Sequence, residues 1–144
     1  MTVPAIISLV TLGVRDVAAA THFYQSLGFA LSSASVEGDV SFFRTNGALL
    51  GLYSQDDLAV DAKSAPRNTD GFRGVTLAIN LDSRDAVDAA MAAAEAAGAS
   101  IAKAPHTAEW GGYSGYFADP DGHLWEIAHN PYWPLGPDGL PQLP

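Results

Sequence analysis

The residue best suited to do chemistry in this chain is Glu126, in the middle of an apolar, aromatic-rich run from Leu124 to His129. Strands are depleted in glutamate, and a carboxylate on a packed sheet is costly unless it is paired or used. A similar run from Gly112 to Ala118 precedes it, and Asp119-Pro120-Asp121-Gly122 between the two runs is typical of a turn. We therefore predict a hairpin that carries one functional carboxylate.

The alternation of side chains along these strands predicts which residues share a face with Glu126. A five-residue loop at 119–123 pairs Tyr116 with Glu126 and leaves Ser114 and Trp110 on the same face. A four-residue loop would shift the register by one residue. In the first register Glu126 is a candidate general base or ligand acceptor, and Tyr116 is a candidate donor to a developing oxyanion. In the alternative interpretation, Glu126 only accepts a hydrogen bond from Tyr116 or from a neighbouring strand hydroxyl.

The elements that position this hairpin occur twice along the chain. Val10-Thr11-Leu12 recurs as Val75-Thr76-Leu77, and each copy lies in a strand-like apolar run that is followed by a helix signal. Three short strand candidates follow each helix, so the expected order is β-α-β-β-β in both halves. The expected strands are Ile6 to Val14, Ala30 to Val36, Val40 to Thr45, Ala48 to Ser54, Gly74 to Leu81, Ser100 to Lys103, Gly112 to Ala118 and Leu124 to His129.

Helix and turn signals set the limits of these elements. Asp16 is a good N-cap for the first helix, the second helix starts near Asp82 or Ser83, and the two helices end at Gly28 and Gly98. Asn46-Gly47 predicts a two-residue hairpin loop. We therefore predict one α+β domain that consists of module one at about 5–54, a polar linker at about 55–71, module two at about 72–130 and a Pro-rich tail at 131–144.

The composition limits the classes of function. The 144 residues are 48% hydrophobic and carry a net charge of −9, which argues against binding to nucleic-acid phosphates or to anionic membranes. The chain has no cysteine, which excludes disulfides, thiolate metal sites and cysteine nucleophiles. The N-terminus lacks the basic region and cleavage site of a secretory signal, so we expect a cytoplasmic location. We expect the aromatic tail, with Tyr132 and Trp133, to dock on the domain or on a second subunit.

A duplicated β-α-β-β-β module that ends in this hairpin resembles the vicinal oxygen chelate superfamily, which includes glyoxalase I, bleomycin-resistance proteins, fosfomycin-resistance transferases and extradiol dioxygenases. The motifs that carry the resemblance are the Asp16 helix entry, Phe23-Tyr24 with Leu27-Gly28-Phe29, and Asp119-Pro120-Asp121-Gly122 followed by Glu126. The resemblance implies curved mixed sheets of two tandem modules that enclose a cleft, and it implies a homodimer. Unrelated activities share this scaffold, so the fold alone does not assign a function.

The resemblance also implies the positions of metal ligands, which in this chain are Leu9, Gly51, Gly74 and Glu126. Metal-dependent relatives carry histidine, glutamate or glutamine at these positions. Catalytic zinc sites generally use three protein ligands and magnesium sites need several oxygen atoms, so one carboxylate is not enough to hold a divalent ion. We therefore expect neither a metal nor another cofactor.

The cleft that the resemblance implies is aromatic and holds one acid. In fosfomycin-resistance transferases, hydroxyl residues that match Ser114 and Tyr116 contact the substrate, which favours the five-residue loop. Alternation places further residues of the other strands on the cleft side. The predicted ligand-binding residues are Trp110, Ser114, Tyr116, Glu126, Thr11, Tyr53 and Thr76, and Glu126 and Tyr116 are the candidate catalytic pair.

The preferred hypothesis is a metal-independent small-molecule-binding protein of the bleomycin-resistance kind, with a cationic or aromatic ligand that stacks on the aromatic walls. The alternative is a metal-independent lyase, isomerase or hydrolase in which Glu126 acts as the general base. A lesser alternative is a metal-dependent enzyme similar to glyoxalases or dioxygenases. All three hypotheses remain open at the level of the sequence.

Overall fold

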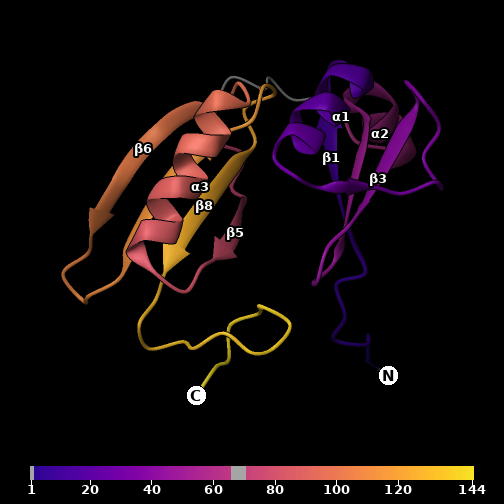
Figure 1. Ribbon diagram of the computed structural model, residues 1–144. Coiled ribbons are helices and arrows are strands. Elements are labelled where there is room, and N and C mark those ends of the chain that lie inside the picture. The colour runs from indigo at the N-terminus through magenta and orange to yellow at the C-terminus, as the bar shows by residue number, and fades with distance from the viewer. Residues whose placement is uncertain (1, 66–70) are drawn as a thin grey trace. The chain divides into compact units, whose positions relative to one another are not determined.

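The computed structural model describes residues 2–65 and 71–144, and the chain divides into two compact units, Met1–Pro66 and Arg67–Pro144 (Figure 1). The elements of the first unit are β1 (Leu9–Val14), α1 (Val17–Ser26), β2 (Ala30–Leu31), β3 (Val40–Arg44), β4 (Leu49–Ser54) and α2 (Gln55–Asp61). Those of the second unit are β5 (Thr76–Asn80), α3 (Arg84–Ala96), β6 (Ser100–Thr107), β7 (Tyr113–Ala118) and β8 (Leu124–His129). The β-α-β-β-β order is confirmed in both units.

Each unit is built on an open, four-stranded mixed sheet. The strand orders are β1-β4-β3-β2 and β5-β8-β7-β6. In both sheets the first strand of the unit runs parallel to the last one, and the other neighbouring strands are antiparallel. The predicted α+β class, with two tandem mixed sheets, is therefore confirmed.

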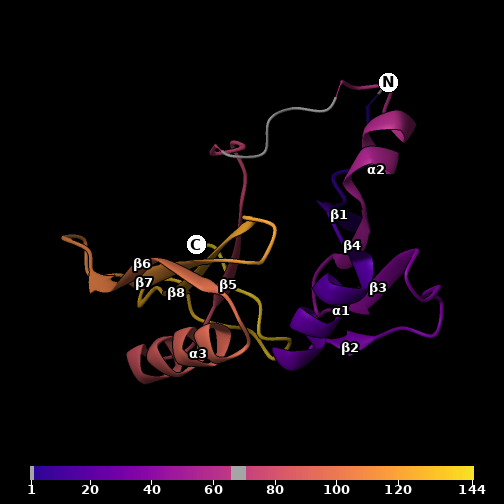
Figure 2. The ribbon, with the colours of Figure 1, turned by 90° about the horizontal axis from the view of Figure 1, so that it is seen from above.

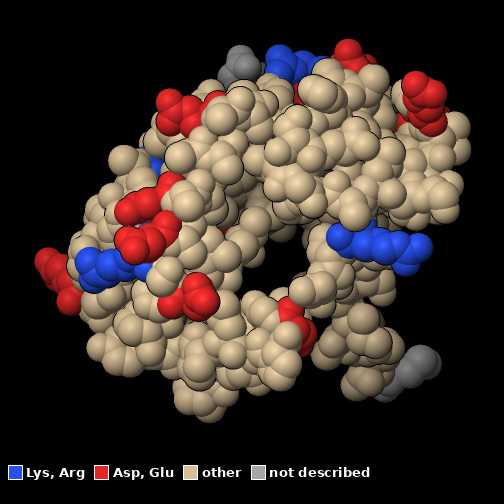
Figure 3. Space-filling view, viewed as in Figure 1, with Lys and Arg blue, Asp and Glu red and all other residues tan. Residues whose placement is uncertain are grey.

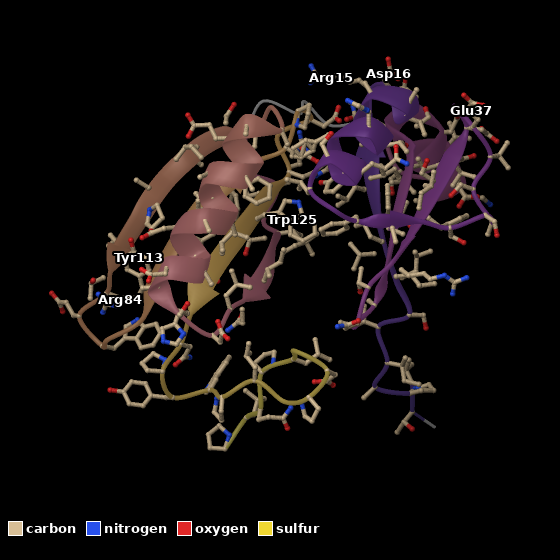
Figure 4. The ribbon with its side chains drawn as sticks, viewed as in Figure 1. Arg15, Asp16, Glu37, Arg84, Tyr113 and Trp125 are labelled. Atoms are coloured by element: carbon tan, nitrogen blue, oxygen red, sulfur yellow. The ribbon has the colours of Figure 1, made fainter. Side chains whose placement is uncertain are left out.

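The two long helices begin and end where the sequence predicts. α1 follows Asp16, whose carboxylate accepts a hydrogen bond from a backbone N–H of the first turn at 3.0 Å (Figure 4). α3 follows Ser83, whose hydroxyl accepts the equivalent bond at 3.1 Å. Gly28 and Gly98 follow the helices at φ values of 98° and 108°, a left-handed conformation that glycine adopts without strain.

α1 packs on one face of the first sheet and buries its apolar side there. Tyr24 and Phe43 are fully buried, and the Tyr24 ring packs against Phe29 and Phe43 with centroids 5.7 and 6.0 Å apart. Ser41 is buried on the same face and shares a hydrogen bond of 2.7 Å with Thr21 of α1. Because its hydroxyl is satisfied, this polar contact joins helix and sheet without a large desolvation penalty.

α3 covers one face of the second sheet (Figure 2). Val87 of the helix is buried there together with Phe117, Trp125 and Ile127 of the strands. The Phe117 and Trp125 rings are stacked, with centroids 6.3 Å apart. Trp125 and Ile127 are therefore core residues. Because side chains alternate along a strand, Glu126 between them points to the face that α3 leaves uncovered, which we call the open face.

The segment that we predicted as a polar linker begins with a helix. α2 starts directly after β4, and the Ser54 hydroxyl accepts a hydrogen bond from the Asp57 N–H in its first turn. A Cβ built at Gly13 of β1 would come within 3.4 Å of the Leu58 side chain, so the helix packs closely on the sheet. This helix was missed because it is short and its residues are mostly polar.

The loop between β3 and β4 also differs from the prediction. It spans residues 45–48, and Gly47 lacks the positive φ that a two-residue type I′ turn requires. The Thr45 hydroxyl closes the loop instead, because it donates to the Ala48 carbonyl and accepts from the Gly47 N–H. A side chain therefore replaces the backbone turn that Asn46-Gly47 indicated.

The second strand of each unit differs in length from the prediction. β2 has only two residues. The backbone N–H of Phe42 in β3 donates a hydrogen bond of 2.9 Å to the Ser35 hydroxyl, so it is not available to extend the pairing with β2. β6 extends to Thr107, four residues beyond its predicted end at Lys103. A side-chain hydrogen bond therefore ends β2 early, whereas shifts in register allow β6 to continue pairing with β7 beyond its predicted end.

β6 is an edge strand whose register against β7 shifts between Ile101 and Lys103 and again between Lys103 and His106. Each shift is a bulge, which kinks a strand and twists it locally. The kinked backbone lies against Gly115 of β7, where a built Cβ would be 2.8 Å from the carbonyl oxygen of Lys103. Gly115 is therefore required by the close approach of two backbones.

The Pro-rich tail turns back on itself after Asn130. Leu135 and Pro141 form an isolated bridge, and Tyr132 lies beside Trp110 with ring centroids 6.5 Å apart. Tyr132 nevertheless remains 68% exposed. The tail thus contacts its own unit through Tyr132, and docking on a second subunit stays a prediction.

The surface around α3 carries more acidic than basic groups (Figure 3), in line with the net charge of −9. No helix in the described part of the chain is long and apolar enough to cross a membrane.

Replacing Gly115 with alanine is expected to destabilise the protein, because the new methyl group would collide with the β6 backbone rather than with a movable side chain. We expect the free energy of unfolding in urea to fall by about 1–3 kcal/mol. Gly51→Ala is the matched control, since Gly51 is also buried in a strand but its Cβ would meet only side-chain atoms, at 3.4–3.6 Å. Equal losses in the two variants would contradict the close backbone approach.

Candidate functional site

The centre of the candidate site is the pair Tyr116 and Glu126 on the open face of the second sheet. The two residues oppose each other on β7 and β8, and the Tyr116 hydroxyl donates a hydrogen bond to Glu126 Oε2 at 3.0 Å. Both side chains are half-buried. The register of the five-residue loop is therefore confirmed. The hydrogen bond from Tyr116 to Glu126 is therefore present, and it leaves lone pairs on the carboxylate for a ligand. The interpretation in which this bond is the only role of Glu126 stays a prediction.

The turn between these strands fixes their register. The buried Asp119 carboxylate accepts hydrogen bonds from the N–H groups of Asp121 and His123 at 2.9 and 2.8 Å. Arg73 holds the outside of the turn, because its guanidinium donates to the Asp121 carbonyl at 2.6 Å and lies 3.0 Å from the His123 ring nitrogen Nδ1. Asp119 is therefore a structural turn residue, as predicted, and the turn keeps the two functional side chains opposite each other.

The surroundings of Tyr116 keep its hydroxyl protonated. Burial, the hydrogen bond to Glu126 and the charge of that carboxylate all raise the pKa of Tyr116 above its ordinary value of 10.0. The hydroxyl is therefore a hydrogen-bond donor at neutral pH. In the part of the chain that the structure describes, no basic side chain pairs with Glu126.

Two more of the predicted residues lie on the open face beside this pair. Ser114 precedes Tyr116 by two residues on β7, so both side chains point to the same side. Ala78 of β5 opposes Glu126, and Thr76 lies two residues before it on the same strand. Because Ala78 has only a methyl group, the residue of β5 directly opposite Glu126 does not cover the carboxylate.

Trp110 lies in the turn before β7, outside the strand, and is 57% exposed. Its ring covers Gly112, where a built Cβ would be only 2.1 Å from the indole. Packing against this glycine and the neighbouring Tyr132 ring therefore positions the indole. Its contact with a ligand stays a prediction.

Thr11 and Tyr53 belong to the first unit and lie on the face of its sheet opposite α1. Thr11 opposes Gly51 of β4, and Tyr53 lies two residues further along that strand. A Cβ at Gly51 would meet side-chain atoms of Leu9 and Thr11 at 3.4 Å and of Phe42 at 3.6 Å. These residues form a mainly apolar surface around a glycine. Their participation in a ligand site stays a prediction.

The helix caps correct one of the four positions implied for metal ligands. The N-caps Asp16 and Ser83 are 67 residues apart, whereas the two Val-Thr-Leu copies are 65 residues apart. The residue that stands 67 positions after Leu9 is Thr76, and Gly74 lies before β5. The choice of Gly74 was therefore wrong by two residues. An error of two residues keeps the implied ligand position on the same face of the strand, but it assigns that position to a different residue.

The residues at the corrected positions do not fit a divalent metal ion. Leu9 and Gly51 have no side-chain donor atom, Thr76 has a neutral hydroxyl, and only Glu126 has a carboxylate. Among residues 2–65 and 71–144, no group of three or more histidine, aspartate or glutamate side chains is placed to hold a metal. Among the described residues, neither unit therefore presents a set of donor atoms that suits a divalent ion.

Two polar residues of the open face were not predicted. The bulges of β6 place Lys103 opposite Tyr116 and His106 opposite Ser114. The sequence signals available were Pro105 in β6 and Gly115 in β7. Such residues indicate an irregular strand, but they do not give the register in which it pairs.

The opposite face of the second sheet carries a polar cluster that joins α3 to the strands. The Tyr113 hydroxyl donates to Asp88 of α3 at 2.6 Å, and this bond raises the pKa of Tyr113. The Arg84 guanidinium lies 5.1 Å from the centre of the Tyr113 ring and donates to the Thr107 hydroxyl (Figure 4). Tyr113 and Tyr116 are therefore two tyrosines of one strand, each bonded to a carboxylate, on opposite faces.

Comparison with known proteins gives one family and several related structures. The model of the Glyoxalase/Bleomycin resistance protein/Dioxygenase superfamily matches residues 6–127, and no curated protein matches the chain. The structure of a glyoxalase-related enzyme from Fulvimarina pelagi is 33% identical, with a TM-score of 0.85 over 96% of this chain and 98% of that chain.

Two further structures are similar at lower identity. A glyoxalase/bleomycin resistance protein/dioxygenase family enzyme from Burkholderia phytofirmans PsJN is 25% identical, with a TM-score of 0.77 over 87% of this chain and 98% of that chain. A lactoylglutathione lyase from Agrobacterium tumefaciens is 27% identical, with a TM-score of 0.66 over 90% of this chain and 97% of that chain.

The ionisation of Tyr116 should depend on Glu126. The difference between the alkaline absorbance titrations of the wild type and Tyr116→Phe isolates Tyr116 among the five tyrosines. We expect its pKa to lie above 10 and to fall, without becoming ordinary, in Glu126→Gln, because burial remains when the charge is removed. The free energy of unfolding should also decrease as the pH rises above about 10, because the folded state then holds the proton more tightly than the unfolded state.

Asp88→Asn is the matched control for this titration. It removes the carboxylate that bonds Tyr113 on the other face and should leave the pKa of Tyr116 unchanged. A Tyr116 pKa that responds equally to both substitutions would contradict the pairing with Glu126.

Proposed function

Because the chain belongs to the Glyoxalase/Bleomycin resistance protein/Dioxygenase superfamily, we propose that it binds a small molecule on the open face of its second sheet, with Glu126 as the principal acceptor. The observation that carries this proposal is the hydrogen bond of 3.0 Å between Tyr116 and Glu126. It holds a half-buried carboxylate in one position on a face that α3 does not cover.

The carboxylate is oriented in this arrangement but is not neutralised. Tyr116 supplies one neutral donor, and no basic side chain of the described residues pairs with Glu126. A half-buried charge with few partners is unfavourable, and a ligand donor would improve its hydrogen bonding. The class of ligand that this favours carries an amine, amide or hydroxyl group that reaches Glu126.

Binding in this proposal does not use a divalent metal ion. The support comes from the chemistry of the residues at the implied ligand positions. Leu9 and Gly51 of the first unit have no side-chain donor atom. In the second unit Thr76 has a neutral hydroxyl and Glu126 has a single carboxylate, which is too few ligands for a divalent ion.

A second candidate function is metal-independent proton transfer by the same pair. Glu126 would remove a proton from a bound substrate, and the Tyr116 hydroxyl would then donate to the developing oxyanion. The raised pKa of Tyr116 favours this candidate, because the hydroxyl keeps its proton at neutral pH. The Tyr116 hydroxyl directs that proton at Glu126, so a substrate would have to redirect it.

A thermal-shift screen in the presence of a chelator tests the proposed function. The panel contains cationic antibiotics, aromatic amines, hydroxy acids and α-oxo acids. Any ligand that stabilises the wild type is expected to bind about tenfold or more weakly to Glu126→Gln, because a charge-assisted hydrogen bond contributes about 1.5–3 kcal/mol. Recovery of the ligand unchanged, measured by mass spectrometry, supports binding alone, and its conversion supports the second candidate.

Two matched substitutions control for indirect effects. Glu95→Gln removes a carboxylate from α3, and Tyr113→Phe removes the hydroxyl on the other face of β7. Both should preserve affinity, whereas Tyr116→Phe should reduce it. Unchanged affinity in Glu126→Gln, or a requirement for added metal, would overturn the proposal.

A further inference from the structure

We propose that the two bulges of β6 build a basic subsite beside Glu126, in which Lys103 binds an anionic group of the ligand. The inference rests on the proposed function, because it assigns a second chemical group to the ligand that Glu126 binds. It also defines the class of ligand as a small organic acid, either a carboxylate or a phosphate monoester, that carries a hydroxyl or amine.

The bulges decide which residues of β6 reach the open face. At the start of the strand, Ile101 opposes Phe117. A regular antiparallel register from this pair would place Ala102 opposite Tyr116, and Lys103 would point to the other face. The observed register places Lys103 opposite Tyr116 instead. The first bulge therefore exchanges an alanine for a cation on the open face.

The second bulge has the same effect one step further along. The regular register would place Ala104 opposite Ser114, whereas His106 occupies that position. The His106 Nδ1 atom lies 3.3 Å from the carbonyl oxygen of Ser114, which fixes the ring beside β7. The Ser114 hydroxyl therefore lies next to Lys103 and can donate a hydrogen bond to an anion. Because the Ser114 carbonyl can only accept, His106 donates through Nδ1 in this contact, and its neutral ring has no second N–H to offer an anion.

Gly115 makes this arrangement sterically possible. The backbone of the bulged segment passes so close to β7 that a Cβ at this position would be 2.8 Å from the Lys103 carbonyl oxygen and 2.9 Å from the Pro105 nitrogen. The glycine therefore admits the bulge that brings Lys103 to the open face. Bulges often re-aim side chains in this way next to functional sites.

The registers of three neighbouring strands align the groups that would recognise the ligand. Lys103 on β6 opposes Tyr116 on β7, which opposes Glu126 on β8. Adjacent strands are about 4.8 Å apart, so the backbones of Lys103 and Glu126 are separated by about 10 Å. A cation and a carboxylate then flank a tyrosine hydroxyl in one row. A ligand that matches this row has its acidic group over β6 and its donor group over β8.

Lys103 is suited to this role because it has no competing ion pair among the described residues. The protein as a whole carries a charge of −9, so an anion is attracted only where a cation is placed locally. Lys103 is also exposed, so its replacement should not disturb the core.

Calorimetric titration with matched probes tests the subsite. Glycerol 3-phosphate and malate each carry an anionic group and a hydroxyl, and glycerol carries hydroxyls alone. We expect one or both of the acids to bind the wild type more tightly than glycerol, and to bind Lys103→Met about ten- to hundredfold more weakly. The comparison of malate with glycerol 3-phosphate distinguishes a carboxylate from a phosphate site.

Lys63→Met is the matched control, because it removes the only other lysine from a turn after α2. It should leave the affinity for both acids unchanged. Equal affinity in Lys103→Met and the wild type, or no binding of either acid to the wild type, would overturn the basic subsite.

The two proposals fail in different ways in this experiment. If a neutral or cationic ligand binds in a manner that depends on Glu126 and not on Lys103, the proposed function stands and the basic subsite is wrong. If the affinity for the acids depends on Lys103 but not on Glu126, the proposed role of Glu126 is overturned and the basic subsite stands.

Discussion

The hydrogen bond between the Tyr116 hydroxyl and Glu126 is the interaction on which the rest of the site depends. It joins the last two strands of the sheet on the face that carries no helix, while Trp125 and Ile127 on either side of Glu126 are buried against α3. The same alternation that anchors the hairpin in the core therefore holds the carboxylate outside it. A shift of one residue would bury the charge and expose the tryptophan, so the stability of the core also enforces the position of the acid.

The fold of this superfamily is retained here although the donor atoms of a metal site are not. Gly51 lies among Leu9, Thr11 and Phe42, which offer a divalent ion one neutral hydroxyl oxygen and no carboxylate. What remains is an acid that is oriented by a neutral hydroxyl. The hydrogen bond to the Tyr116 hydroxyl orients the Glu126 carboxylate directly.

Features that depend on local or periodic patterns could be predicted from the sequence. Capping chemistry and strand alternation predict the cap at Asp16, the start of α3 near Asp82 or Ser83, the core residues beside Glu126 and the hairpin register. Features that depend on backbone contacts between strands could not. Nothing in the spacing of Ser100 to Thr107 gives two register shifts, and the Thr45 hydroxyl overrides the turn preference of its neighbours. The Val-Thr-Leu repeat was misleading because a slide of two residues preserves every apolar position.

The kinked edge of the second sheet has a consequence for how this protein can evolve. β6 has a strand partner on one side only, and residues 100–104 are all exposed, so the core places little constraint on their identity. The irregular edge is also a poor template for the strand of another molecule, which lowers the hazard of aggregation. Substitutions along this strand can therefore retune selectivity while the hairpin that carries the acid, and the stability of the scaffold, stay constant.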